Sequence, residues 1–73
     1  MQETSSKERD FRVKIGQNLK TIRESKGLSQ EELAAIIDIT RTTISKVENG
    51  KFGFSVDLLG KYSDVFGVNI FIK

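Results

Sequence analysis

The stretch Leu28 to Lys51, LSQEELAAIIDITRTTISKVENGK, carries the start and end signals of two short helices. Ser29 followed by Glu32 is an S-x-x-E capping box, in which the serine oxygen accepts a hydrogen bond from a first-turn amide and the carboxylate bonds the serine amide. The box predicts a helix that begins at Gln30. Apolar residues recur along this helix at helical spacing, and they are Leu33, Ala34, Ile36 and Ile37.

A second helix is predicted from Arg41 to Asn49. Thr40 can cap its start, and Gly50 marks its end because glycine readily takes the left-handed conformation that closes a helix. The turn between the two helices, Asp38 to Thr40, is only about three residues long. Two short helices joined by such a turn fit the helix-turn-helix motif, which makes DNA the leading candidate partner.

The second helix has one apolar face and one polar face. When Ile44 and Val47 are placed against a core, the helical period turns a set of polar side chains outward. This set is Arg41, Thr42, Ser45, Lys46 and Asn49. Short hydrogen-bonding groups and two cations suit the base edges and phosphates of a DNA major groove. A solvated helix surface has a similar composition, so the DNA interpretation depends on the preceding helix and turn.

Three segments of the chain resemble the phage repressor and Cro type of helix-turn-helix domain. They are GLSQEELA at Gly27 to Ala34, TRTTISKVENGK at Thr40 to Lys51, and FGV at Phe66 to Val68, within a resemblance that spans about Ile15 to Val68. The resemblance implies that Gln30 begins a positioning helix, where it contacts phosphate or supports the recognition helix. It also implies which residues meet base edges and nearby phosphates, namely Arg41, Thr42, Ser45 and Lys46.

We therefore expect two groups of DNA contacts from this motif. The residues expected to read bases are Arg41, Thr42, Ser45 and Lys46. The residues expected to fix the register on DNA, by phosphate contact or by positioning, are Gln30, Thr40, Asn49 and Lys51. The resemblance further implies a structural ion pair between Arg23, late in the first helix, and Glu48.

Asp38 in the turn departs from the family pattern. Family members usually carry glycine there, at a position that tends to need a positive φ. Aspartate visits that region more readily than most side chains, so we expect the turn to form with some strain.

The chain has 73 residues and a net charge of +2, from 12 basic and 10 acidic residues. This length predicts one domain, residues 1–73, with modest stability unless a second subunit adds to it. Because the numbers of basic and acidic residues are nearly equal, the net charge does not by itself indicate nucleic-acid binding. A local basic surface is nevertheless expected, because three cations lie within the motif, and they are Arg41, Lys46 and Lys51.

The chain contains no cysteine and no histidine. Their absence excludes a disulfide framework and removes the commonest metal ligand and general base. We expect no metal site, no cofactor and no enzymatic activity. The N-terminal residues lack the apolar core of a signal peptide and no run is long enough to span a membrane, so a cytoplasmic location is expected. The family resemblance implies a bacterial source.

The remaining segments complete an all-α, four-helix bundle of the repressor type. A long first helix should end at Gly27, with an apolar stripe of Phe11, Ile15, Leu19 and Ile22. Ser55 is expected to cap a fourth helix, whose core-facing positions are Leu58, Leu59, Tyr62, Val65 and Phe66. Gly60 within this helix costs about 1 kcal/mol relative to alanine, which predicts a close approach of another backbone.

Residues 67–73 have the composition of a short β-strand, because branched aliphatic residues alternate with others after a helix-ending glycine. A lone strand cannot satisfy its own backbone groups, so we expect it to pair with the same strand of a second copy. The dimerisation residues would be Val68, Ile70, Phe71 and Ile72. The alternative is a fifth helix, as in many repressors of the resembled family.

These features predict sequence-specific binding of double-stranded DNA by a transcriptional regulator. A homodimer would space two recognition helices by one turn of duplex, about 34 Å, which suits a palindromic operator. Repression is the default action in the resembled family. The alternative is an antitoxin-like module that grips a protein toxin and binds DNA secondarily. No small-molecule ligand and no membrane partner is evident in the sequence.

Overall fold

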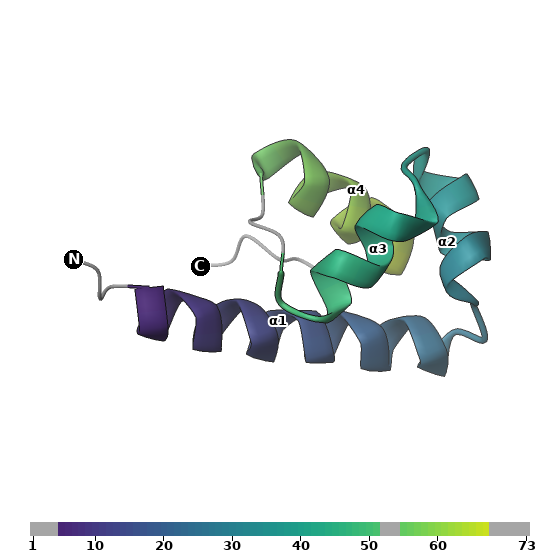
Figure 1. Ribbon diagram of the computed structural model, residues 1–73. Coiled ribbons are helices and arrows are strands. Elements are labelled where there is room, and N and C mark those ends of the chain that lie inside the picture. The colour runs from purple at the N-terminus through teal and green to yellow at the C-terminus, as the bar shows by residue number, and fades with distance from the viewer. Residues whose placement is uncertain (1–4, 52–54, 68–73) are drawn as a thin grey trace.

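The computed structural model describes residues 5–51 and 55–67, with side chains from residue 7 onward. The described residues form four helices and no strand, which confirms the all-α prediction for this part of the chain (Figure 1). The helices are α1 (Ser5–Ser25), α2 (Gln30–Ile37), α3 (Arg41–Glu48) and α4 (Val56–Phe66). Of the predicted strand, Gly67 is the left-handed C-cap of α4, and residues 68–73 with the dimerisation residues lie outside the described residues.

Side-chain caps set the starts of three helices. The Ser29 Oγ accepts from the Glu32 amide at 3.0 Å, and the Glu32 Oε1 accepts from the Ser29 amide at 2.8 Å. This is the predicted capping box, and α2 begins at Gln30 as expected. Helices α3 and α4 start with the hydroxyl cap alone, because the Thr40 and Ser55 hydroxyls accept from amides three residues on.

The end of α3 is closed by backbone hydrogen bonds around Gly50. Gly50 has a φ of 72°, its amide donates to the Val47 carbonyl, and the Lys51 amide donates to the Lys46 carbonyl at 2.8 Å. This pair of bonds is a Schellman motif, which only a left-handed residue can close without strain. The helix therefore ends at Glu48, with Asn49 as its cap, one residue earlier than predicted.

The turn between α2 and α3 is closed by Asp38. Its φ of 59° and ψ of 48° place it in the left-handed region, which confirms the positive φ expected at this departure from the family pattern. The conformation lets the Ile39 amide donate back to the Ala34 carbonyl at 3.0 Å. A left-handed aspartate costs on the order of 1 kcal/mol, and the closing hydrogen bond offsets part of it.

One apolar core joins the four helices. Its buried members are Leu19, Leu33, Ala34, Ile37, Ile44, Val47, Leu58, Tyr62 and Phe66. Within it the rings of Tyr62 and Phe66 meet edge to face, with centroids 5.4 Å apart. Two of the predicted fourth-helix core positions, Leu59 and Val65, are only half-buried.

Two apolar residues of the predicted helical patterns lie on the surface. Phe11 is 64% exposed and Ile36 is 54% exposed. Helix α1, at about 32 Å, is far longer than α3 at about 12 Å, and its N-terminal turns project beyond the other helices (Figure 1). The stripe on α1 therefore has partners only from its middle onward. On α2 the core takes Leu33 and Ile37, which leaves Ile36 on the outer side.

The backbone of α1 comes very close to the end of α3. A Cβ built on Gly16 would collide with the Val47 carbonyl oxygen and lie 2.9 Å from that of Glu48. A Cβ on Gly50 would lie 2.8 Å from the Cα of Val13. Real Cβ atoms do not approach backbone so closely, so α1 and α3 can pack at this distance only with glycine at both positions.

Gly60 makes no such contact, and the close approach predicted there is wrong. Among the residues that the structure describes, no atom lies within 4 Å of a Cβ built on Gly60, apart from its own helix and chain neighbours. The glycine therefore costs α4 conformational entropy without a packing gain.

Alanine substitutions at the two helical glycines should have opposite effects. Gly60→Ala should raise the free energy of unfolding by about 0.5–1 kcal/mol, because it enters open space and favours the helix. Gly16→Ala should lower it by about 1–3 kcal/mol, because α1 must move away from α3. Urea denaturation followed by circular dichroism measures both, and the same sign for the two variants would contradict this packing.

Candidate nucleic-acid interface

Helix α3 buries one face and presents the other to solvent. Ile44 and Val47 are fully buried, as the sequence analysis placed them. The opposite side carries Arg41, Thr42, Lys46 and Asn49, which are exposed, and Ser45, which is half-buried. The side chains of Arg41, Thr42 and Lys46 form no hydrogen bond or ion pair with any residue that the structure describes. Three of the four predicted base-reading side chains are therefore available to an external group.

Two of the predicted positioning residues, Asn49 and Thr40, are engaged within the motif. The Asn49 Nδ2 donates to the Ser45 carbonyl at 2.8 Å, so this amide completes the cap of its own helix. The Thr40 Oγ1 accepts from the Thr43 amide at 3.1 Å and lies 2.9 Å from the Thr43 Oγ1. Lys51 is exposed and follows the end of α3 directly. These contacts fix both ends of the helix.

Thr43 has a part in the motif that the sequence analysis missed. Its hydroxyl pairs with that of Thr40 at the N-terminus of α3, and the side chain is half-buried. The available signal was the spacing of two threonines at a cap and at its third helical position, where side chain and cap commonly bond each other.

A buried ion pair holds α3 to the helices before it. Glu48, 2% exposed, accepts hydrogen bonds from Arg23 Nε at 2.6 Å and Arg23 Nη2 at 3.1 Å. Its Oε1 also accepts from Gln30 Nε2 at 3.0 Å. The third guanidinium nitrogen, Arg23 Nη1, donates to the Leu28 carbonyl at 2.7 Å. One centre therefore connects α1, the α1–α2 turn, α2 and α3.

This ion-pair centre also engages the side chain of Gln30. The resemblance allowed Gln30 either phosphate contact or support of the recognition helix, and its amide nitrogen bonds Glu48 of that helix. The side chain is half-buried. Bonding to Glu48 raises the pKa of Arg23 above its ordinary value, so the guanidinium stays charged.

Burial also affects the tyrosine beside this ion pair. The Tyr62 hydroxyl is buried and has no hydrogen-bond partner among the described residues. Desolvation raises the pKa of Tyr62 well above its ordinary value, and the Glu48 carboxylate adds to the effect. The hydroxyl is therefore neutral throughout the ordinary pH range.

The outer side of α3 is electropositive because its one acid points inward. Glu48 is the only acidic residue of α3, and its charge is neutralised by Arg23 inside the fold. The exposed cations Arg41 and Lys46 therefore have no acid on α3 to offset them, and Lys51 adds a third exposed cation just beyond its end. A patch of this kind attracts an anionic partner even on a chain whose net charge is only +2.

Two other kinds of site are not present in the part of the chain that the structure describes. No group of three or more acidic, histidine or cysteine side chains is placed to hold a metal ion. None of the helices α1 to α4 is long and apolar enough to cross a membrane.

The fold and this exposed, cationic helix define a helix-turn-helix domain, and comparison with known proteins agrees. The helix-turn-helix family model matches residues 19–72, and the chain belongs to that family. The family is one of DNA-binding transcription regulators.

Three relatives illustrate the similarity. The control protein C.MunI from a Mycoplasma species is 42% identical over 62 residues, 84% of each chain. The antitoxin PezA from Streptococcus pneumoniae is 36% identical over 55 residues, which are 75% of this chain and 35% of PezA. The crystal structure of the restriction-modification controller protein C.AhdI from Aeromonas hydrophila superposes with a TM-score of 0.74. It is 35% identical, and the match covers 78% of this chain and 86% of C.AhdI.

Removal of one partner from the buried ion pair should destabilise the fold strongly. Arg23→Met should lower the free energy of unfolding by about 3–5 kcal/mol, because the Glu48 carboxylate stays buried without its cation. The double variant Arg23→Met/Glu48→Leu should recover most of that loss, since no charge is left unpaired. Thermal or urea unfolding of the two single variants and the double variant measures the coupling. Additive losses would show that the two side chains act independently.

Proposed function

We propose that this protein is a transcriptional repressor that binds a palindromic DNA operator as a homodimer, with residues 1–73 acting as one domain. The observation that carries the proposal is the outer face of α3. It combines exposed cations with side chains that have no bonding partners inside the described structure. Membership of a helix-turn-helix family supports the same conclusion, because in this motif the second helix lies in the major groove.

The base-reading roles follow from side-chain chemistry. Arg41, at the exposed start of α3, is our candidate for a bidentate contact to guanine, which a guanidinium matches best. Thr42 and Ser45 can bond base edges or contact a thymine methyl group. Lys46, one helical turn after Thr42 on the exposed face, can reach a base or a phosphate.

The phosphate and positioning roles are assigned to residues at the ends of the motif helices. The Lys51 ammonium group, just beyond α3, has no partner among the described residues and is our candidate for a direct phosphate contact. Thr40 and Asn49 act mainly by closing the ends of α3, where their hydrogen bonds already lie. Gln30 acts through Glu48 and thereby holds α3 at its angle to α2.

Dimerisation is assigned to the C-terminal segment, which lies outside the described residues. The support comes from the sequence alone, namely the strand-forming pattern of residues 67–73. Its members expected at the interface are Val68, Ile70, Phe71 and Ile72. Two copies related by a two-fold axis would read the two halves of a palindrome.

Selection of bound duplexes from a random DNA pool tests the proposed function. The purified full chain should enrich a palindrome at about 0.15 M salt, where nonspecific phosphate binding is already weakened. Transcription from a reporter promoter that overlaps the enriched site should then fall when the protein is supplied. If no sequence is enriched, the protein is not an operator-binding regulator.

Two single substitutions should separate base reading from phosphate contact. Arg41→Ala should lose about 1–3 kcal/mol of binding free energy on the selected operator and relax the preference at one base pair. Lys51→Ala should weaken binding to all duplexes alike and reduce the salt slope by about one. Affinity titrations on operator and scrambled duplexes at several salt concentrations distinguish these outcomes. Equal losses on every duplex for both variants would overturn the assignment.

Removal of the C-terminal segment should abolish the dimer. A variant that ends at Gly67 should sediment as a monomer where the full chain sediments as a dimer, because the proposed strand pair is gone. It should bind a half-site with little change and lose the gain that the full palindrome provides. A truncated protein that stays dimeric in sedimentation would contradict this assignment.

The second candidate function is that of an antitoxin, and the similarity to PezA favours it. The match covers only 35% of PezA, so the similarity by itself does not transfer an antitoxin activity to this chain. A protein that copurifies in a stoichiometric complex from the native host, and whose toxicity this chain suppresses, would support this function over operator binding as the primary role.

A further inference from the structure

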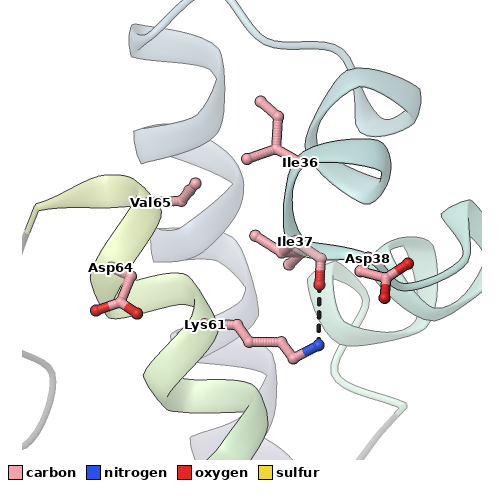
Figure 2. Close-up of a pocket in the computed structure, with 6 residues that line it drawn as sticks. All are labelled: Ile36, Ile37, Asp38, Lys61, Asp64 and Val65. Carbon is pink, nitrogen blue, oxygen red and sulfur yellow. Dashed lines mark hydrogen bonds between the residues drawn. The ribbon is translucent and has the colours of Figure 1, made fainter.

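Three cationic side chains are partly or fully buried in the part of the chain that the structure describes, and they are Arg12, Arg23 and Lys61. Burial of a charged group is costly unless hydrogen bonds replace its hydration. Arg23 bonds the Glu48 carboxylate. Lys61, beside the hollow between α2 and α4, donates to the Ile37 carbonyl at 3.0 Å (Figure 2). Two of the three cations therefore have their partners inside the fold.

Arg12 has no such partner. The side chain is half-buried, and its Nε is buried without a hydrogen bond to any residue that the structure describes. Glu8 lies one helical turn before it, at a spacing that permits an ion pair, but the two form none in the described structure. A guanidinium stays charged at any ordinary pH and has five N–H groups to donate. An external anion would supply both the missing charge and the missing acceptors.

Arg12 lies on the face of α1 that packs against the end of α3. Gly16 on this face meets the Val47 carbonyl, and Val13 meets Gly50, just beyond the helix. Arg12 is four residues before Gly16, so the helical period places it on the same face, one turn nearer the N-terminus. Contacts that move toward the N-terminus of α1 thus move past the C-terminal end of α3 (Figure 1). The face continues there beyond α3.

Arg9 is the next side chain on this face. It lies seven residues before Gly16, close to two full turns, and it is exposed. It forms no hydrogen bond or ion pair with any described residue. Glu8 and Asp10 each lie about 100° around the helix from it, in opposite directions. Its nearer neighbours, three and four residues away, include no acid. Those neighbours are Ser5, Ser6, Arg12 and Val13.

The position of the core shows which way Arg9 is turned. Ile15 and Ile22 pack against the core, and the helical period places both on one side of Gly16. Val13 and Arg9 lie on the other side of Gly16, away from the core. The outer face of α3 also lies away from the core, so α1 and α3 present cations toward the same side of the molecule.

Lys51 brings the cation after α3 close to this face of α1. A Cβ built on Gly50 lies 2.8 Å from the Cα of Val13. Because Lys51 and Arg12 are the chain neighbours of these two residues, their α-carbons lie within about 12 Å of each other. Long cationic side chains on α-carbons this close can contact neighbouring phosphates of one DNA strand.

We propose that Arg9 and Arg12 bind a phosphate of the DNA strand next to the phosphate contacted by Lys51, which makes α1 part of the DNA interface. The inference rests on the DNA binding that the proposed function assumes. A guanidinium matches a phosphate with two parallel hydrogen bonds. Such a contact is independent of sequence, so it adds affinity and fixes orientation without a base preference. The close backbone contact at Gly16 and Gly50 then sets the distance between this phosphate and the recognition helix.

Substitution of each arginine by glutamine tests the contact in the full chain. Arg9→Gln and Arg12→Gln should each weaken binding by about threefold or more, on the selected operator and on a scrambled duplex alike, and reduce the salt slope by about one. Lys14→Gln is the matched control, because Lys14 is exposed and lies on the far side of α1 from Gly16. It removes the same charge and should leave the salt slope unchanged.

Two further measurements separate the contact from an effect on the fold. Circular dichroism should show all three variants folded, and Arg9→Gln alters only an exposed side chain. Arg12→Lys keeps the charge but loses the planar pair of donors. It should therefore retain the salt slope of the natural chain and still lose part of the affinity.

A neutral methylphosphonate, placed at one phosphate of the duplex at a time, locates the contact. At the phosphate bound by Arg12, the neutral linkage should weaken the natural chain and leave the affinity of Arg12→Gln unchanged, because the two losses are coupled. The proposal is wrong if neither arginine variant shows such a phosphate, or if Lys14→Gln loses as much affinity as they do.

The scrambled duplex separates this proposal from the proposed function. Phosphate contacts do not depend on sequence, so the losses at Arg9 and Arg12 are measurable on it even if selection enriches no operator. That result would overturn only the proposed function. Normal operator selection with unchanged affinity and salt slope in both variants would overturn only the contact by α1. Absence of binding to any duplex would overturn both.

Discussion

The buried carboxylate of Glu48 is the constraint on which the arrangement of the first three helices depends. It is 2% exposed and belongs to the helix that presents the candidate DNA-binding face. A carboxylate in that position is tolerated only where cations and donors surround it, so Arg23 and Gln30 must converge on it from α1 and α2. Arg23 also bonds the Leu28 carbonyl, which extends the constraint into the turn between those helices. The angle of α3 is thus fixed by hydrogen-bond geometry as well as by apolar packing.

Packing of the backbones provides the second constraint. An eight-residue helix such as α3 is not stable alone in water, because helix nucleation is costly. It is held by Ile44 and Val47 in the core and by the close contact of its C-terminal end with α1 at Gly16. The hydrogen-bonded Glu48 carboxylate and this backbone contact therefore act on the same short helix. The backbone contact leaves no room for a side chain to be added at Gly16 between α1 and α3.

The local features of this fold could be predicted well from the sequence. The capping box of α2 and the apolar positions of α3 depend on residues close together in the chain, and patterns of spacing are sufficient to find them. The positive φ of Asp38 was expected from the family resemblance. Local spacing does not indicate the partners of Glu48, because Arg23 and Gln30 lie 25 and 18 positions from it. The Arg23 pair was expected only from the family resemblance, which left two roles open for Gln30. The roles of individual side chains toward DNA remain predictions.

The differences from the sequence analysis arose because a helical pattern gives no information about the positions of neighbouring helices. Phe11 continues the apolar stripe of α1, but the period does not state where the partner helices end. Ile36 has helical spacing with Leu33 and Ile37, yet α2 is covered along only part of its circumference. Gly16 and Gly60 look alike in sequence, and only the positions of the other helices distinguish an essential glycine from a dispensable one.

The side chains on the outer face of α3 are separate from those that hold the helix in the fold. Arg41, Thr42 and Lys46 make no internal bonds to the described residues, whereas the residues that hold the helix face the other way. Scaffold and recognition surface are therefore encoded by separate positions of the same eight-residue helix. Mutation can change the outer positions one at a time without loss of foldability. A lineage of such proteins can thus acquire new binding preferences through small, individually viable steps while the architecture is inherited unchanged.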